Sequence, residues 1–105
     1  MRRKKIYIIQ ESRINKLLDD FFWEKIKGVK AFPLEFDYIH YIKNQNVLFE
    51  VEKVPKDHEL GMSKILFNQI RNIFSLSQDE TKDYIIGKME KMLNKKFTGI
   101  YLFDV

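Results

Sequence analysis

Leu34–Val54 has the sequence LEFDYIHYIKNQNVLFEVEKV, in which two runs of alternating apolar and polar residues flank the turn Asn44-Gln45-Asn46. Alternation with a period of two predicts β-strands, and a short polar turn between two such runs predicts an antiparallel hairpin. We expect Lys43 to pair with Asn46 across this turn. The segment therefore predicts a sheet around which the rest of the chain must pack.

This pairing sorts the side chains of the hairpin onto two faces. The apolar face is predicted to carry Leu34, Phe36, Tyr38, His40, Ile42, Val47, Phe49 and Val51. The other face is predicted to carry Glu35, Asp37, Ile39, Tyr41, Leu48, Glu50, Glu52 and Val54. Asp37 then lies directly opposite Glu52, and like charges that face each other across a ladder repel unless a cation or water relieves them. Asp37, Glu50 and Glu52 are the candidate site, while His40 is expected to be buried with one hydrogen bond.

Two further patterns precede the hairpin. Lys5–Ile9 is rich in β-forming residues and is predicted to be a first strand. Apolar residues at three- and four-residue spacing then predict a helix over Ser12–Lys27. Ser12 is the expected N-cap of this helix, and Gly28 is the expected left-handed residue after its end.

Three patterns follow the hairpin. A second helix is predicted after Glu59 and runs to about Phe74. A third helix is predicted from the capping-box spacing of Ser77 and Glu80. Thr98–Val105 is predicted to be a closing strand.

The predicted order is β-α-β-β-α-α-β, which indicates an α+β domain with one sheet of about four strands and the helices on one face. If the second and third helices form one crossover, the order matches the split β-α-β arrangement of ferredoxin-like domains. The chain has 105 residues, of which 45% are hydrophobic, so residues 1–105 are expected to form a single domain with its own core.

The composition limits the classes of function. A charged fraction of 32% and a mean hydropathy of −0.37, without a long apolar run, predict a soluble protein that does not span a membrane. The chain has no cysteine, which excludes disulfides and thiolate metal sites and makes the cytoplasm the expected compartment.

The charge of the chain is uneven. The net charge is +4 and the pI is 9.2, and much of the positive charge lies in Arg2, Arg3, Lys4 and Lys5. These four residues are candidates for contacts with the phosphates of a nucleic acid. The alternative is that a basic terminus keeps the chain soluble and protects an edge strand from pairing.

The acidic hairpin resembles, in outline, the core of restriction-endonuclease-like nucleases. That family has an acidic residue on the first helix, an Asp on one strand and Glu-x-Lys on the next. The matching positions here are Glu11, Asp37 and Glu50-Val51-Glu52, with Gln69 on the following helix and Glu52 in the lysine position. The resemblance implies a Mg²⁺ site that activates water or stabilises a phosphate transition state. The alternative is an ordinary solvated face of a half-buried hairpin.

The aromatic content favours a binding function. The chain has nine Phe, five Tyr and one Trp, more than a core of this size needs, so some aromatic side chains are expected on the surface. Exposed aromatics are enriched at interfaces. We predict a surface with Tyr41, Ile39, Leu48 and Trp23 that binds a protein partner or forms a homodimer. The leading hypothesis is a small non-enzymatic accessory or inhibitor protein without a cofactor, such as a phage or mobile-element product. The alternative is a nuclease that depends on a divalent metal.

Overall fold

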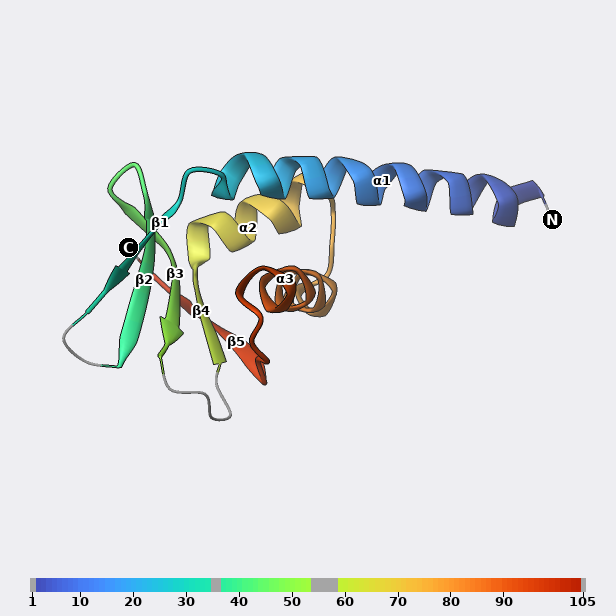
Figure 1. Ribbon diagram of the computed structural model, residues 1–105. Helices are drawn as coiled ribbons and strands as arrows, with labels where there is room; N and C mark the ends of the chain where they lie inside the picture. The colour runs from blue at the N-terminus through green and yellow to red at the C-terminus, as the bar shows by residue number, and fades with distance from the viewer. Residues whose placement is uncertain (1, 35–36, 54–58, 105) are drawn as a thin grey trace.

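The computed structural model describes residues 2–34, 37–53 and 59–104, with side chains from Arg13 onward. In this part of the chain, three helices and five strands follow the order α-β-β-β-β-α-α-β (Figure 1). Their bounds are α1 Arg2–Ile26, β1 Lys30–Pro33, β2 Tyr38–Lys43, β3 Asn46–Glu52, β4 Glu59–Ser63, α2 Lys64–Ile73, α3 Gln78–Leu93 and β5 Gly99–Phe103. The strands form one sheet in sequence order, and β4 and β5 are its parallel pair. The α+β class with a single sheet is confirmed.

The predicted first strand is wrong, because Lys5–Ile9 lies inside α1. No Gly or Pro separates this segment from the helix predicted over Ser12–Lys27, and extending a helix is far cheaper than nucleating another element. Ser12 is therefore an internal residue of α1 and not its N-cap. The end of the helix is as predicted, since Gly28 follows it with a φ of +81°. Without a first strand, the predicted element order and the ferredoxin-like arrangement are not confirmed.

Two strands were missed by the sequence pattern. β1 is a short edge strand that pairs with β2, where Pro33 is tolerated because an edge residue need not donate to the ladder. β4 pairs with β3 on one side and β5 on the other, although Glu59–Ser63 adjoins a helical pattern. Met62 fits the stripe of the following helix in sequence but is a fully buried strand residue.

The hairpin forms with the predicted turn but with a different register. Asn44 and Gln45 have φ values of +50° and +66°, as a two-residue hairpin turn requires, and Lys43 pairs with Asn46. A β-bulge then shifts the ladder beyond Ile42 and Val47, and Tyr41 pairs with Phe49. The additional residue is Leu48, so Leu48 and Phe49 both pack with the core, which strict alternation forbids.

The bulge corrects the predicted faces. Glu52 lies opposite Tyr38 and not opposite Asp37, and Glu50 lies opposite His40. Tyr38 and His40 therefore share a face with the two glutamates. Ile39 and Tyr41, which were predicted on the acidic face, pair with Val51 and Phe49 on the face that carries the core. A one-residue shift moves every side chain of a strand segment to the other face relative to its neighbour.

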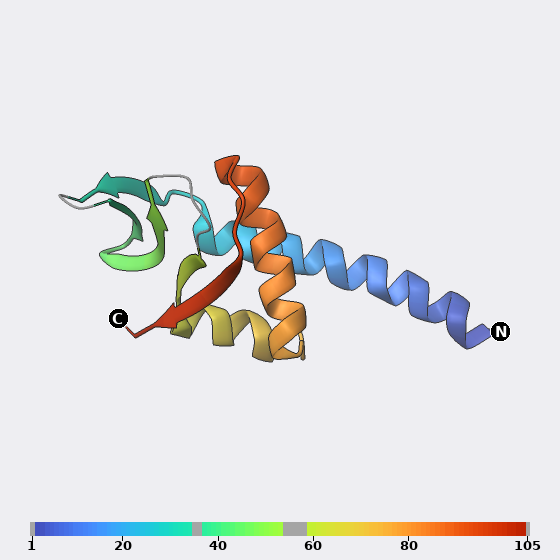
Figure 2. The ribbon, with the colours of Figure 1, turned by 90° about the horizontal axis from the view of Figure 1, so that it is seen from below.

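All three helices lie on one side of the sheet (Figure 2). The buried core there comprises Leu18, Phe22, Ile26, Phe49, Val51, Leu60, Met62, Leu66, Phe67, Ile70, Ile85, Met89, Phe97 and Ile100. The rings of Phe22 and Phe49 meet edge to face, with centroids 6.4 Å apart, and so attach α1 to β3. The N-terminal half of α1 extends beyond the other elements (Figure 1), and the molecule measures 56 × 29 × 21 Å.

The later elements agree with the sequence. Ser77 and Glu80 form the predicted capping box at the start of α3, with distances of 3.1 and 2.9 Å. The closing strand is present as β5, which reaches β4 through a crossover made of α2 and α3. Among the described residues, no helix is long and apolar enough to cross a membrane.

A polar clamp joins α1 to α3. The Asp19 carboxylate accepts a hydrogen bond from the Tyr84 hydroxyl at 2.6 Å and pairs with the Lys88 ammonium at 2.9 Å. Burial by itself raises the pKa of Asp19, but the hydrogen bonds from Tyr84 and Lys88 outweigh it and hold that pKa below its ordinary value. Burial and the bond to Asp19 raise the pKa of Tyr84.

We expect Asp19→Asn to destabilise the fold at neutral pH and to have a smaller effect in acid. Since the pKa of Asp19 is lowered in the folded state, its contribution is present above the ordinary value of 3.8 and is lost as the pH falls through the lowered pKa. Urea unfolding of the variant and the wild type at about pH 7 and about pH 2 measures this difference. Asp20→Asn, at an exposed position next to Asp19, is the control, and an equal pH dependence in both variants would contradict the assignment.

Candidate functional site

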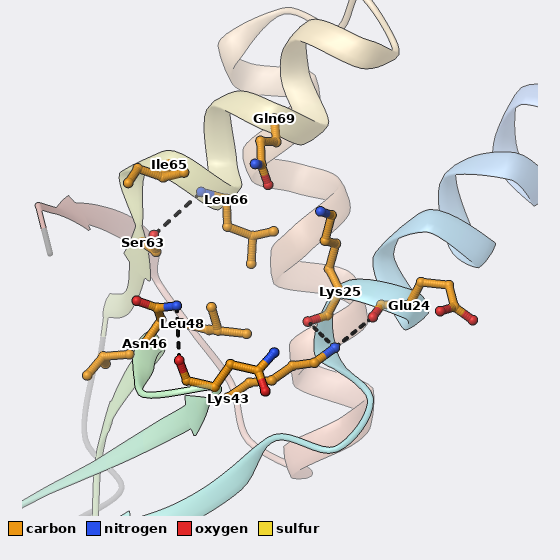
Figure 3. A pocket seen from close by; sticks show the side chains of 11 residues that line it. Glu24, Lys25, Lys43, Asn46, Leu48, Ser63, Ile65, Leu66 and Gln69 are labelled. Atoms are coloured by element: carbon orange, nitrogen blue, oxygen red, sulfur yellow. Dashed lines mark hydrogen bonds between the residues drawn. The ribbon is translucent and has the colours of Figure 1, made fainter.

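A pocket of about 380 Å³ lies where α1, the β2–β3 hairpin and α2 meet (Figure 3). Its apolar lining consists of Val47, Leu48, Ile65 and Leu66. Its polar lining includes Lys25, Lys43, Asn46 and Gln69. A volume of this size lies at the lower end of the range for small-molecule pockets, and it admits one or two side chains of a partner.

The chain leads directly from β4 into α2 at this pocket. Ser63 is the last residue of β4 and the N-cap of α2, and its Oγ accepts a hydrogen bond from the Leu66 amide at 3.4 Å. This cap sets the first turn of α2 beside the hairpin. Leu66 turns into the core, whereas Ile65 remains 60% exposed at the pocket.

The two lysines of the pocket have different roles. The Lys43 ammonium donates to the backbone carbonyls of Glu24 and Lys25, at 2.8 and 3.2 Å, where the end of α1 carries unpaired carbonyls. This contact attaches the hairpin to α1. The Lys25 ammonium lies 5.3 Å from the centre of the Phe21 ring and extends toward Gln69 (Figure 3).

Several large aliphatic side chains of α1 and α2 are exposed, and one of them, Ile65, lines the pocket. The Phe21 and Phe74 rings meet edge to face, with centroids 5.6 Å apart, so the two helices lie side by side. One and two turns before Phe21, Leu17 and Ile14 lie on the same side of α1. Ile65 and Ile73 lie two turns apart on α2. These four large side chains, which we term the α1–α2 face, are exposed by 42 to 60%: Ile14, Leu17, Ile65 and Ile73.

A polar row crosses the opposite face of the sheet. In one cross-strand line, His40 pairs with Glu50, Glu50 with Gly61, and Gly61 with Tyr101. The His40 Nε2–H donates to Glu50 Oε2 at 2.7 Å, and the Tyr101 hydroxyl donates to Glu50 Oε1. Gly61 makes this possible, because a Cβ there would lie 2.7 Å from the Tyr101 ring. The row ties three strands together and orients the carboxylate.

Two tyrosines at the polar row, Tyr101 and Tyr38, have raised pKa values. Burial and the hydrogen bond to Glu50 raise the pKa of Tyr101. The neighbouring Glu52 carboxylate is the main cause that raises the pKa of Tyr38, and desolvation and Glu50 add to it. Both shifts favour the neutral phenol, so the tyrosines act as hydrogen-bond donors to the carboxylates.

The predicted carboxylate site is brought together only in part. Glu50 and Glu52 share a face, but Asp37 does not face Glu52 as the hairpin register required. Glu11 lies in α1, but its side chain is outside the described side chains, which begin at Arg13. Among the described residues, no group of three His, Asp or Glu side chains could hold a metal ion. The metal-dependent nuclease stays a prediction, and no observed cluster supports it.

The predicted partner-binding residues also separate. Tyr41 and Leu48 pack against the core, and burial raises the pKa of the Tyr41 hydroxyl. Ile39 is half-buried, whereas Trp23 is 57% exposed on α1. The side chains of Arg2, Arg3, Lys4 and Lys5 lie outside the described side chains, so their role in nucleic-acid binding stays a prediction.

Sequence reasoning named Leu48 and Gln69 of the pocket lining, but in two separate candidate sites, and it missed the pocket itself and the α1–α2 face. Leu17, Ile65 and Ile73 fit the three- and four-residue spacing from which the helices are predicted, and such spacing is typical of a buried stripe. One signal was available, since Ile65 and Ile73 lie eight residues apart, on a flank of the stripe whose centre is Leu66 and Ile70. No comparable pattern in the sequence indicates that the Tyr101 side chain passes over Gly61 to reach Glu50.

No protein-family model matches the chain, and no solved structure matches it significantly. The chain is similar to the periplasmic chaperone PpiD of Buchnera aphidicola subsp. Schizaphis graminum, with 26% identity over 107 aligned residues. The similarity covers 93% of this chain but 17% of the chaperone, so the chain spans about a sixth of the length of the relative that it matches.

Proposed function

We propose that this chain is a polypeptide-binding module whose α1–α2 face holds apolar segments of an unfolded or extended partner chain. The observation that carries the proposal is that four large aliphatic side chains of two adjacent helices are half-exposed, and that one of them, Ile65, lines the pocket. Large apolar side chains that gather on one surface mark interaction sites more often than scattered ones do. The proposal keeps a protein partner, as the sequence suggests, but moves the surface from the sheet to the two helices.

The size of the surface indicates the strength of binding. A half-exposed Leu or Ile contributes roughly 1 kcal/mol when a partner covers it. Four such side chains only modestly exceed the cost of ordering a flexible segment, so we expect weak and reversible binding. This is the behaviour required of a module that takes up and releases many segments.

The similarity to a protein named as a chaperone gives independent support. A chaperone binds apolar segments that a folded protein would bury, and the α1–α2 face is suited to such segments. The compartment stays a prediction: the sequence favours the cytoplasm, whereas the similar chaperone is named as periplasmic.

The direct test is binding to a permanently unfolded probe. We expect the chain to bind fluorescently labelled, reduced and carboxymethylated α-lactalbumin in an anisotropy titration. Leu17→Ser combined with Ile73→Ser should weaken this binding about tenfold or more, because two anchors of the face are lost. Since both positions are more than half exposed, the melting temperature should change little.

Met92→Ser is the matched control. Met92 is 47% exposed on α3, and this helix contributes no residue to the α1–α2 face or to the pocket lining. Its replacement should leave the affinity within about twofold of the wild type, well inside the effect of a lost anchor. An equal loss in the control, or no binding by the wild type, would refute the proposal. A stable dimer in light scattering that the double variant converts to a monomer would instead identify a second copy as the occupant.

A further inference from the structure

The pocket beside the α1–α2 face has an uneven charge. Glu24 is the one acid among the described residues that line it, and its carboxylate pairs with Lys27 at 3.0 Å. Figure 3 shows this carboxylate directed away from the pocket. The Lys43 ammonium is held by two carbonyls of α1. The remaining positive charge among the described lining residues is Lys25, which lines the pocket together with Gln69 (Figure 3).

The surroundings of Lys25 strengthen its attraction for an anion. Its side chain is half-buried against the Phe21 ring, and the pocket near it is lined by Leu48, Ile65 and Leu66. Because the side chain is half-buried, its ammonium is partly shielded from water, and a charge pair formed there is stronger than one on a fully exposed surface. A carboxylate bound in the pocket can accept a charge-assisted hydrogen bond from the Lys25 ammonium, and the Gln69 amide is a further donor of the same lining.

We propose that the pocket selects apolar segments that contain an acidic side chain, with Lys25 as the group that binds the carboxylate. The inference rests on the proposed function and adds the chemistry of the preferred segment. Aliphatic side chains of the segment cover Ile65 and Ile73, while a neighbouring Glu or Asp places its carboxylate between Lys25 and Gln69. Charge complementarity therefore identifies the occupant as an acidic, apolar peptide.

A pair of peptides tests this selection. The probes are Ac-SLLELFS-NH₂ and Ac-SLLQLFS-NH₂, which differ in one carboxylate and have blocked ends. We expect calorimetric titration at low salt to give about tenfold tighter binding of the acidic peptide, the size of one charge-assisted hydrogen bond. Added salt should reduce the difference, because salt still screens an ion pair that is only half-buried. The second peptide with a free C-terminal carboxylate is the third probe, and it should bind like its blocked form.

Lys25→Met is the decisive variant. It keeps a long side chain on Phe21 but removes the charge, so it should bind both blocked peptides equally and leave the affinity for the neutral one unchanged. Lys16→Met, at an exposed position of α1 outside the pocket lining, should keep the tenfold preference. Circular dichroism and melting temperature check that both variants fold.

Each other outcome overturns a defined statement. A wild type that binds both blocked peptides equally overturns the selection and leaves the proposed function standing. A preference that survives in Lys25→Met overturns the role of Lys25, and tight binding of the free terminal carboxylate overturns the assignment to a side chain. A wild type that binds neither these peptides nor the unfolded probe overturns both proposals.

Discussion

Phe49→Ala is expected to lower the free energy of unfolding by about 3–5 kcal/mol, the largest effect of any change considered for this chain. Phe49 is 1% exposed, lies opposite Met62 in β4 and meets the Phe22 ring of α1. Removal of the ring leaves a cavity between the sheet and α1 that neither element can close. Because small domains have a net stability of only about 5–15 kcal/mol, the variant should lose much of its stability.

Urea unfolding followed by circular dichroism measures this loss. Phe32→Ala is the matched control, since Phe32 is an aromatic residue of the same sheet but is 47% exposed on the edge strand β1. The control should change the free energy of unfolding by about 0.5 kcal/mol or less. A loss below about 1 kcal/mol in Phe49→Ala would contradict the position of Phe49 at the centre of the core.

Gly61→Ala is expected to lower the free energy of unfolding by about 1–3 kcal/mol. The new Cβ would lie 2.7 Å from the Tyr101 ring, which must swing away and release its hydrogen bond to Glu50. In a Tyr101→Ala background the space is empty, and the same change should be neutral or slightly stabilising, because alanine restricts the unfolded chain. The double-mutant cycle therefore isolates the contact between residues 61 and 101.

Gly87→Ala is the control for this cycle. A Cβ at this exposed position of α3 would meet no atom within 4 Å, so the change should stabilise the helix by about 0.5–1 kcal/mol in either background. If Gly61→Ala lowers the free energy of unfolding by the same amount with and without the Tyr101 ring, the contact between residues 61 and 101 does not explain the loss.

The candidate site was less predictable than the fold. Glu50 and His40 were recognised from their residue types, but the wrong register assigned them to opposite faces of the hairpin. The sequence did not identify Lys25 as a binding residue, because a lysine in the last turn of a helix is common and is favoured there by the helix dipole. Its role at the pocket depends on α2, which lies about forty residues later in the chain, and no local pattern contains that distance.

The sequence by itself determined the features that depend on neighbours along the chain. Four features follow from local spacing: the helix over Ser12–Lys27, the positive φ of Gly28, the turn after Lys43 and the capping box at Ser77. Each of them is stabilised by contacts within about four residues, so the residue types suffice to predict them.

Only the tertiary structure decided which of several locally acceptable arrangements is formed. Alternation permits the hairpin with or without a bulge, and the bulged form is favoured because it lets Leu48 and Phe49 both reach the core. Glu59–Ser63 becomes a strand because β3 and β5 are available on both sides to pair with it. Ile65 and Ile73 remain exposed because the core is already filled by Leu66 and Ile70. In each case, contacts between distant segments outweigh a local preference of less than about 1 kcal/mol per residue.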